Sequence, residues 1–216
     1  MSELTDSSAA ALADEPLPAS AATRKRPRPG ERRVQILQTL AEMLQQPGAE
    51  RITTAALAAK LSVSEAALYR HFASKAQMFE GLIEFIETSV FTLVNQIAER
   101  EPAGAPQAQR IATLLLQFAE RNPGMVRVMC GDALVFEHER LIARMNQFFD
   151  RVEGQLRMSL RSAADANGSD TPTLQAQALA SALTALIVGR LQRYARSGFK
   201  RAPTEHLDLV LPRLTS

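Results

Sequence analysis

A helical repeat of apolar residues runs through the chain from residue 31 onward, and it restricts the possible folds more than any other feature. Apolar side chains recur at intervals of three and four residues, so they lie along one side of each predicted helix. The first stripe consists of Val34, Leu37, Leu40, Ala41 and Leu44. The longest consists of Met78, Leu82, Phe85, Ile86, Ser89, Leu93 and Ile97. No segment alternates apolar and polar residues as a half-buried strand would, so we predict an all-α protein.

Capping and breaker residues divide this repeat into separate helices. Ser64 and Ser74 stand where a side-chain oxygen can accept a backbone N–H group at a helix start, and Gln77 completes a capping box with Ser74. Either Thr53 or Thr54 can cap the helix before them. A proline–glycine pair at positions 47 and 48 ends the first helix. The predicted helices span residues 31–46, 53–61, 64–71, 75–100, 108–121, 124–135, 137–164 and 173–197.

Charge is distributed unevenly, although the net charge of the whole chain is only +2. Residues 24–80 contain ten Lys or Arg and five Asp or Glu, a balance of +5, whereas residues 81–216 carry +1 and residues 1–23 carry −4. Positive charge on one domain is the electrostatic signature of a phosphate-binding surface, although a solvated basic face gives the same balance.

Residues 1–29 are rich in Ala, Ser and Pro and lack apolar periodicity, which predicts a disordered tail. The tail ends in a basic arm formed by Arg24, Lys25, Arg26 and Arg28. Such an arm can lie along a DNA groove, or it can serve only to keep the chain soluble.

Residues 51–79 predict two short helices joined by a tight turn and followed at once by a third helix. Ala58 is small enough for the first two helices to cross closely. Ser62 lies in the turn, where glycine is common because it tolerates a positive φ angle. Val63 and Leu68 are placed to hold the second helix against the core. This arrangement is typical of a helix-turn-helix, whose second helix enters the major groove with its N-terminal residues.

The side chains around this turn suit contact with DNA. Small or polar residues at the start of the second helix allow the backbone to approach base edges. Tyr69 and His71 can donate to phosphates, and Arg70 can also read guanine. Lys75 opens the third helix, where a positive charge is disfavoured unless an anion such as a phosphate lies nearby. The predicted DNA-binding residues are Thr53, Thr54, Ser64, Glu65, Ala67, Tyr69, Arg70, His71 and Lys75.

At these residues the sequence resembles the TetR class of regulators. The resemblance rests on Thr53–Leu61, Val63-Ser64, Leu68–Phe72 and Ser74-Lys75. It implies an all-helical, Ω-shaped homodimer with N-terminal heads that bind double-stranded DNA and a larger C-terminal helical body. We therefore expect a tail over residues 1–29, a helix-turn-helix DNA-binding domain over residues 30–76, and a dimerisation and partner-binding domain over residues 77–216.

Within that class, the chain resembles the branch of SlmA-type nucleoid occlusion factors. This similarity is carried by Ser64–Phe72, Leu82–Glu87, Glu120–Gly124, Arg144–Arg157 and Arg196–Lys200, among other segments. It implies a factor that binds specific chromosomal sites, with one or more dimers per site, and that inhibits assembly of the FtsZ ring when it is bound to DNA. It also implies that the acidic FtsZ tail docks on the body. The matching partner-binding residues are Phe85, Leu114, Arg121 and Asn122. Leu93 stands where the family commonly has Arg, and Gln117 stands where it has Gly.

Two other interpretations account for the same residues. A ligand-responsive TetR-type repressor would bind a small effector in its body. Its pocket would be lined by Met125, Met129, Met145 and Phe148, although core packing explains these residues equally well. A helical adaptor would not bind DNA at all. For Arg121 and Asn122, a simple helix C-terminus is the structural alternative to a partner site.

Catalytic and metal-binding motifs do not occur in the sequence. His71, His138 and His206 lack metal-ligand spacing, and there is no phosphate-binding glycine loop or nucleophile elbow. We therefore predict a protein that is not an enzyme and has no cofactor or metal. Cys130 is the only cysteine and lies in an apolar stretch, where we expect it to be buried. The weakly polar run Ala178–Gly189 is shorter than the ~20 residues of a membrane span, so we predict a cytoplasmic, nucleoid-associated protein without a membrane partner.

Overall fold

The computed structural model describes residues 30–46 and 51–215, and the regular secondary structure of those residues is entirely helical. The first three helices are α2 (Glu31–Leu44), α3 (Thr54–Lys60) and α4 (Glu65–Tyr69). They are followed by α5 (Lys75–Arg100), α6 (Ala105–Arg121), α7 (Pro123–Met129), the 3-10 helix η2 (Asp132–Leu134), α8 (Glu139–Ala166), α9 (Pro172–Arg196) and α10 (Leu207–Thr215). The all-α prediction is therefore confirmed. The predicted tail with its basic arm and the break at positions 47 and 48 lie outside the described residues.

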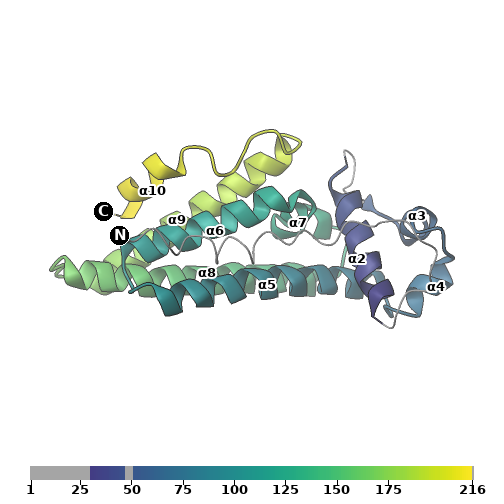
Figure 1. Ribbon diagram of the computed structural model, residues 1–216, viewed down its shortest axis with the longest axis horizontal. Coiled ribbons are helices and arrows are strands. Elements are labelled where there is room, and N and C mark those ends of the chain that lie inside the picture. Colours follow the sequence, from purple (N-terminus) through teal and green to yellow (C-terminus); the bar gives the residue numbers. More distant parts are fainter. Residues whose placement is uncertain (1–29, 47–50, 216) are drawn as a thin grey trace, which may run out of the picture.

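Figure 1 shows an elongated molecule in which α2, α3 and α4, here called the head, gather at one end. α5 begins beside the head and continues along the body, where it packs against α6 and α8. α8 and α9 pack against each other, and α10 lies on α6 and α9 at the end of the body away from the head. The expected domain boundary after residue 76 falls inside α5, so one continuous 26-residue helix belongs to both parts.

The predicted capping residues begin their helices. Of the two threonine candidates, Thr53 is the N-cap of α3, and its hydroxyl accepts the Ala56 N–H at 3.1 Å. Ser64 and Ser74 cap α4 and α5 in the same way. The capping box at α5 is modified, because the side-chain carbonyl of Gln77 accepts the N–H of the residue before the cap rather than that of Ser74 itself.

Ser62 adopts the positive φ angle that its place in the turn predicts, with φ at 55°. The Val63 N–H donates to the Ala58 carbonyl at 3.0 Å, and the Ser62 N–H donates to the Ala59 carbonyl at 3.0 Å. These two bonds form a Schellman motif, in which the left-handed position is usually glycine. The same motif ends α9, where Gly198 occupies that position with φ at 63°. Ser62 therefore carries a backbone cost of ~1–2 kcal/mol that glycine would avoid.

Three differences from the predicted helices are larger than two residues. α6 begins at residue 105 rather than 108, because Pro106 lies in its first turn, where a missing N–H costs nothing. The helix predicted over residues 124–135 ends at Met129, since Gly131 turns the backbone left-handed with φ at 84°. α10 was not predicted, and Pro212 inside it is the reason, because an interior proline argues against a helix.

The core also differs from the predicted stripes. Val34 is 46% exposed, and Ile36 is fully buried in its place on α2. On α5 the buried stripe is rotated, so that Val90 is buried whereas Phe85 and Leu93 are only partly buried. The rotation leaves both side chains on a flank of α5.

Two glycines let the body approach the head closely. Gly124 of α7 lies against the backbone of α2, and a Cβ atom there would overlap the carbonyl oxygen of Ala41. Gly81 of α5 faces the side chain of Leu37, and a Cβ atom there would lie 3.0 Å from the two Leu37 methyl carbons. The sequence suggests only a helix breaker at Gly124, but in the structure this residue permits backbone contact between two helices.

Candidate nucleic-acid interface and partner-binding face

Most of the predicted DNA-binding residues lie on or directly beside α3 and α4, which stand at the end of the molecule (Figure 1), and Lys75 begins α5. Leu68 is 1% exposed and holds α4 to the core, whereas Tyr69 is 45% exposed. Thr53, Ser64, Glu65, Arg70 and His71 are also exposed, and Thr54 and Ala67 are partly buried. The start and one side of α4 therefore face solvent, as a recognition helix requires.

Hydrogen bonds fix the position of α4 within the head. The Thr54 hydroxyl donates to the Glu65 carboxylate at 2.5 Å, which joins the start of α3 to the start of α4. The Arg33 guanidinium donates to the His71 carbonyl at 2.9 Å and lies 4.1 Å from the Phe72 ring centre. Sequence reasoning missed Arg33, although a cation near the carbonyl end of a short helix is a favourable arrangement.

Lys75 finds its anion within the chain. Its Nζ lies 2.5 Å from Oε1 of Glu137, and the two side chains are 26% and 9% exposed. The neighbouring residue Phe136 is 67% exposed and lies under the Arg51 guanidinium, 5.7 Å from it. The segment before α8 therefore contacts the residues that flank the helix-turn-helix on both sides. The ion pair explains a lysine at a helix start without a phosphate, and a DNA contact by Lys75 stays a prediction.

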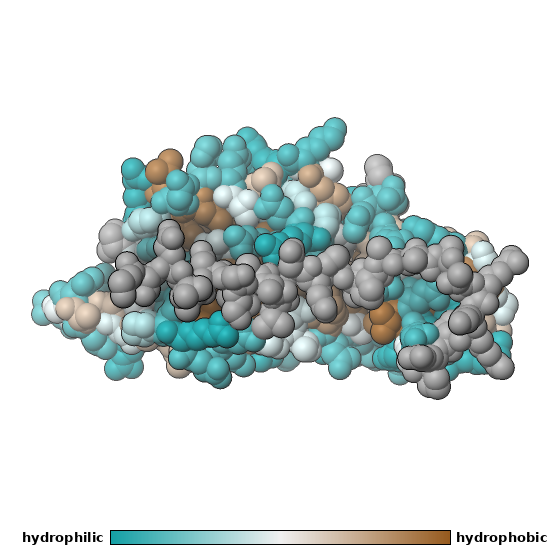
Figure 2. Space-filling model, viewed as in Figure 1, coloured by the Kyte–Doolittle hydropathy of each residue, from teal (hydrophilic) through white to brown (hydrophobic). Residues whose placement is uncertain are grey.

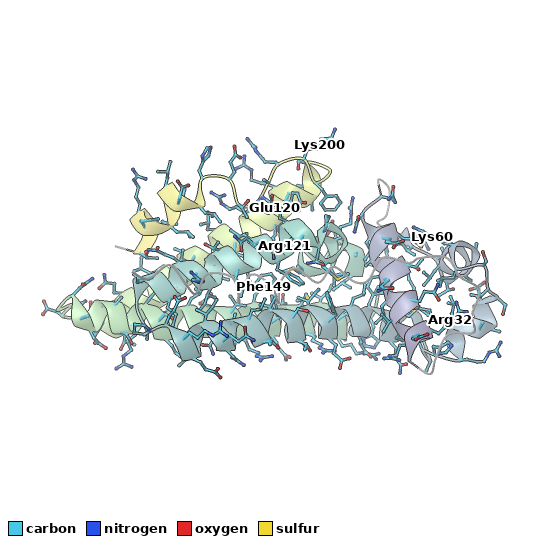
Figure 3. The ribbon with its side chains drawn as sticks, in the orientation of Figure 1. Arg32, Lys60, Glu120, Arg121, Phe149 and Lys200 are labelled. Carbon is cyan, nitrogen blue, oxygen red and sulfur yellow. The ribbon has the colours of Figure 1, made fainter. Side chains whose placement is uncertain are left out.

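The predicted partner-binding residues lie on α5 and α6, which pack side by side. The ring centres of Phe85 and Phe118 are 6.2 Å apart, and Leu114 lies one turn before Phe118 on α6. Arg121 is exposed in the last turn of α6 (Figure 3). Asn122 follows it, and its amide donates to the Phe118 carbonyl at 2.8 Å. Asn122 therefore serves as a helix end, while the face combines apolar side chains with a cation at one end.

Charged contacts join α5 to the first half of α8. The contacts, in order along α5, are Glu80–Arg140, Glu87–Arg144 and Phe91–Arg151. The middle pair is bidentate, with Nη2–Oε2 at 2.6 Å and Nε–Oε1 at 3.1 Å, and the hydrogen bonds to Glu87 raise the pKa of the Arg144 guanidinium. Because the residue numbers rise together, the two helices run parallel and fix the direction of α5.

The methionines and Phe148 considered for a ligand pocket belong to the core. Met125, Met129, Met145 and Phe148 are at most 4% exposed. A hollow of about 390 Å³ opens elsewhere, beside the second half of α9 and the loop after it. Cys130 is partly buried, and burial, followed by the nearby Asp132 carboxylate, raises its pKa to about 12. Among residues 30–46 and 51–215, no three His, Cys, Asp or Glu side chains gather as a metal site would require.

Figure 2 shows one face of the molecule, on which hydrophilic residues cover most of the described surface and hydrophobic residues appear only in small separate patches. Scattered apolar side chains of this kind are normal on a folded protein.

Two protein families match this chain. The family of bacterial regulatory proteins of the tetR type matches residues 36–82, and the SlmA-like family of tetracyclin repressor-like C-terminal domains matches residues 106–216. The nucleoid occlusion factor SlmA of Photobacterium profundum is 52% identical over 178 residues, which cover 82% of this chain and 90% of that protein. The SlmA of Aliivibrio fischeri is 51% identical over 183 residues, covering 84% and 93%.

Solved structures of transcriptional regulators share the fold. The ketosteroid regulator KstR2 of Mycobacterium tuberculosis matches with a TM-score of 0.66 at 19% identity, covering 87% of this chain and 96% of its own. FadR of Bacillus subtilis, solved with stearoyl-CoA, matches with a TM-score of 0.66 at 15% identity, covering 84% and 97%. This chain thus belongs to the TetR family of DNA-binding regulators and, within it, to the SlmA-type nucleoid occlusion factors.

Proposed function

We propose that this nucleoid occlusion factor binds specific chromosomal sites as a homodimer and, when bound to DNA, inhibits FtsZ ring assembly over the chromosome. The observation that carries the proposal is the exposed side of α4, held in place by Thr54–Glu65 and Arg33–His71 at the tip of the head. It would work in the cytoplasm, in association with the nucleoid.

In the proposed DNA complex, the start of α4 enters the major groove. The polar side chains Ser64 and Glu65 meet base edges there, while Tyr69 and His71 donate to the phosphates beside them. Arg70 either reads a guanine through its two donors or binds a phosphate. The preset angle between α3 and α4 supports this role, because little ordering entropy is lost when DNA binds.

The homodimer is supported by α9, which the chain leaves largely uncovered. By length and composition alone, α9 is apolar enough to cross a membrane, so its apolar stretch is longer than the run Ala178–Gly189 considered in the sequence. Only 33% of the most apolar part of this helix is buried inside the chain. Its open side carries Ala178, Ala182, Ala185 and Gly189 at four- and three-residue spacing. Small residues allow another helix to approach closely, so a four-helix interface formed with α8 and the same two helices of a second copy would cover this side.

FtsZ is proposed to dock on the α5–α6 face. Phe85 and Leu114 offer an apolar surface to an extended peptide, and the Arg121 guanidinium can take a carboxylate of an acidic tail. Leu93 and Gln117 make this face less cationic and bulkier than the family pattern, so the charge contact depends more heavily on Arg121.

The DNA step is tested by fluorescence anisotropy with a duplex recovered by selection with the purified full chain. Arg70→Gln should weaken specific binding by ~1–3 kcal/mol if Arg70 reads a base. Lys60→Gln is the control, because it removes an exposed head cation that already pairs with Glu42 at 3.6 Å. An affinity that does not depend on salt would reject DNA binding, since phosphate contacts release counterions.

The partner step is tested with the C-terminal peptide of FtsZ and the DNA-loaded protein. Arg121→Ala should weaken peptide binding by about 10-fold or more, because a charge-assisted hydrogen bond contributes ~1.5–3 kcal/mol. Arg110→Ala is the matched control, since Arg110 lies on the same helix near its other end and pairs with Glu101. Equal losses in both variants, or no peptide binding well above micromolar concentration, would reject FtsZ as the partner.

A further inference from the structure

A second concentration of positive charge lies in the body. It is not apparent from the net charge of residues 81–216, which is only +1. Residues 190–201 contain five Lys or Arg and no Asp or Glu, and no acidic residue occurs between Asp170 and Glu205. The five cations are Arg190, Arg193, Arg196, Lys200 and Arg201. All of them are exposed except Arg190, which is partly buried.

The turn that carries Lys200 and Arg201 is held rigidly from below. The Ser197 hydroxyl donates to the Tyr194 carbonyl at 2.8 Å and accepts the backbone N–H groups of Lys200 at 3.1 Å and Arg201 at 2.9 Å. Phe199 adopts a positive φ of 62°, and its ring centre lies 5.2 Å from that of Tyr194. A non-glycine residue in this region costs ~1–2 kcal/mol, so the surrounding contacts must overcome strain to keep this turn in place.

Arg190 has a structural role, which separates it from the other four cations. Its Nη1 donates to the carbonyls of Pro203 at 2.9 Å and Glu205 at 2.6 Å, and so fastens the loop to α9. The other four cations, here called the basic turn, make no ion pair with any residue in the described ranges 30–46 and 51–215. Two carboxylates of this region make other contacts, since the Glu205 carboxylate lies 3.5 Å from the His206 ring and Glu120 accepts a hydrogen bond from Thr204.

The basic turn lies at the end of the body that faces the head. The Phe199 ring lies 5.5 Å from the guanidinium of Arg127 on α7. α7 in turn packs on α2 of the head, where Gly124 meets Ala41. Figure 3 shows Lys200 on the loop after α9, at the end of α9 nearer the head. Through α7, the basic turn is therefore connected to the head that carries the predicted recognition helix.

We propose that the basic turn is a second DNA-contact surface, which binds the phosphate backbone of the duplex that the head holds. This inference rests on the proposed DNA-binding function and extends it to the body. Four cations without an ion-pair partner in the described ranges, on a rigid support, match a polyanion, and long Lys and Arg side chains contact phosphates without reading bases. The surface therefore adds affinity and salt dependence, whereas sequence preference stays with α4.

The test compares binding of the selected duplex at several KCl concentrations for the wild-type chain and three variants. The double variant Lys200→Gln/Arg201→Gln should make the slope of log K against log salt less negative by ~1.8, because each lost phosphate contact removes ~0.9. Its preference for the selected duplex over a scrambled one should be unchanged. The control Arg100→Gln/Arg110→Gln removes the same charge from the end of the body away from the head, where α5 and α6 meet. The charge-preserving variant Lys200→Arg/Arg201→Lys should restore the wild-type slope.

The outcomes distinguish failure of the basic turn as a DNA surface from failure of the proposed DNA-binding function. A wild-type slope in the Lys200→Gln/Arg201→Gln variant, or an equal change in the control, overturns the basic turn as a DNA surface. So does a variant that loses binding to FtsZ while its DNA slope is unchanged, since the occupant would then be an acidic protein segment. If the wild-type chain itself shows no salt dependence and no site preference, the proposed function fails instead.

Discussion

Replacing Gly124 by alanine tests how the head is fixed to the body. Gly124 lies in the first turn of α7 and is buried against α2, where a Cβ atom would overlap the carbonyl oxygen of Ala41. That oxygen belongs to a helical backbone and cannot rotate away. The two helices must therefore separate, and the head must shift relative to the body.

The magnitude follows from two opposing effects. Overpacking a rigid contact costs ~1–3 kcal/mol, and occasionally more, whereas alanine gains at most ~1 kcal/mol over glycine in helix propensity. We expect Gly124→Ala to lose about 2 kcal/mol, which lowers Tm by ~4–8 °C for a chain of this size. Gly81→Ala is the matched control, because its Cβ atom would meet only the methyl carbons of Leu37 at 3.0 Å, and this side chain can move. Its stability should stay within ~1 kcal/mol of wild type.

Thermal unfolding at one fixed protein concentration, followed by DNA titration, measures both effects. The concentration is fixed because the proposed dimerisation would make Tm depend on it. Gly124→Ala should also weaken DNA binding, since the heads shift, whereas Gly81→Ala should bind as wild type does. If the two variants melt at the same temperature, the close approach of α7 to α2 does not fix the head, and the reasoning is wrong.

Three further predictions concern single sites. Ser62→Gly should stabilise the head by up to ~1 kcal/mol, because glycine accepts the φ of 55° without strain; a drop in the urea midpoint would contradict this. The pKa of Cys130 is higher in the folded chain, at about 12, than its ordinary value of 9.0, so the unfolded chain loses this proton first. Stability should therefore fall as pH rises above about 9, by ~1 kcal/mol at pH 10, and Cys130→Ala should remove this component from the pH profile of urea unfolding. For Glu87 and Arg144, whose side chains are 20% and 34% exposed, a double-mutant cycle should give a coupling energy of ~1 kcal/mol, and a value near zero would show that the bidentate pair adds no stability.

Local signals predicted the head well because the chemistry there is local. Capping by Thr53 and Ser64 and the left-handed turn at Ser62 depend on residues within one or two turns of the chain. Tertiary contacts were harder to predict. The partner of Lys75 is Glu137, 62 positions away, and nothing near either residue identifies the other.

Rotation of the buried stripe on α5 depended on a similar tertiary effect. Periodicity placed Phe85 and Leu93 on the predicted core side, but α5 packs against α6 and α8 together, and the two contacts turn both residues to a flank. The basic turn escaped notice for a different reason. The net charge of residues 81–216 sums 136 residues, so the charges of Lys200 and Arg201 are cancelled in it by acidic residues far away. Only the fold shows that no acid in the described part of the chain pairs with them.

The continuity of α5 from head to body makes this helix a lever. A helix of 26 residues that rises ~1.5 Å per residue is about 39 Å long. A tilt of about 5° around its far end moves the head by ~3.4 Å, which is the axial rise of DNA per base pair. Two heads that swing in opposite directions would change the separation of their half-sites by about two base pairs. In the proposed homodimer, the distance between half-sites would therefore set the tilt of α5. The position of the face that carries Phe85 would then depend on that distance.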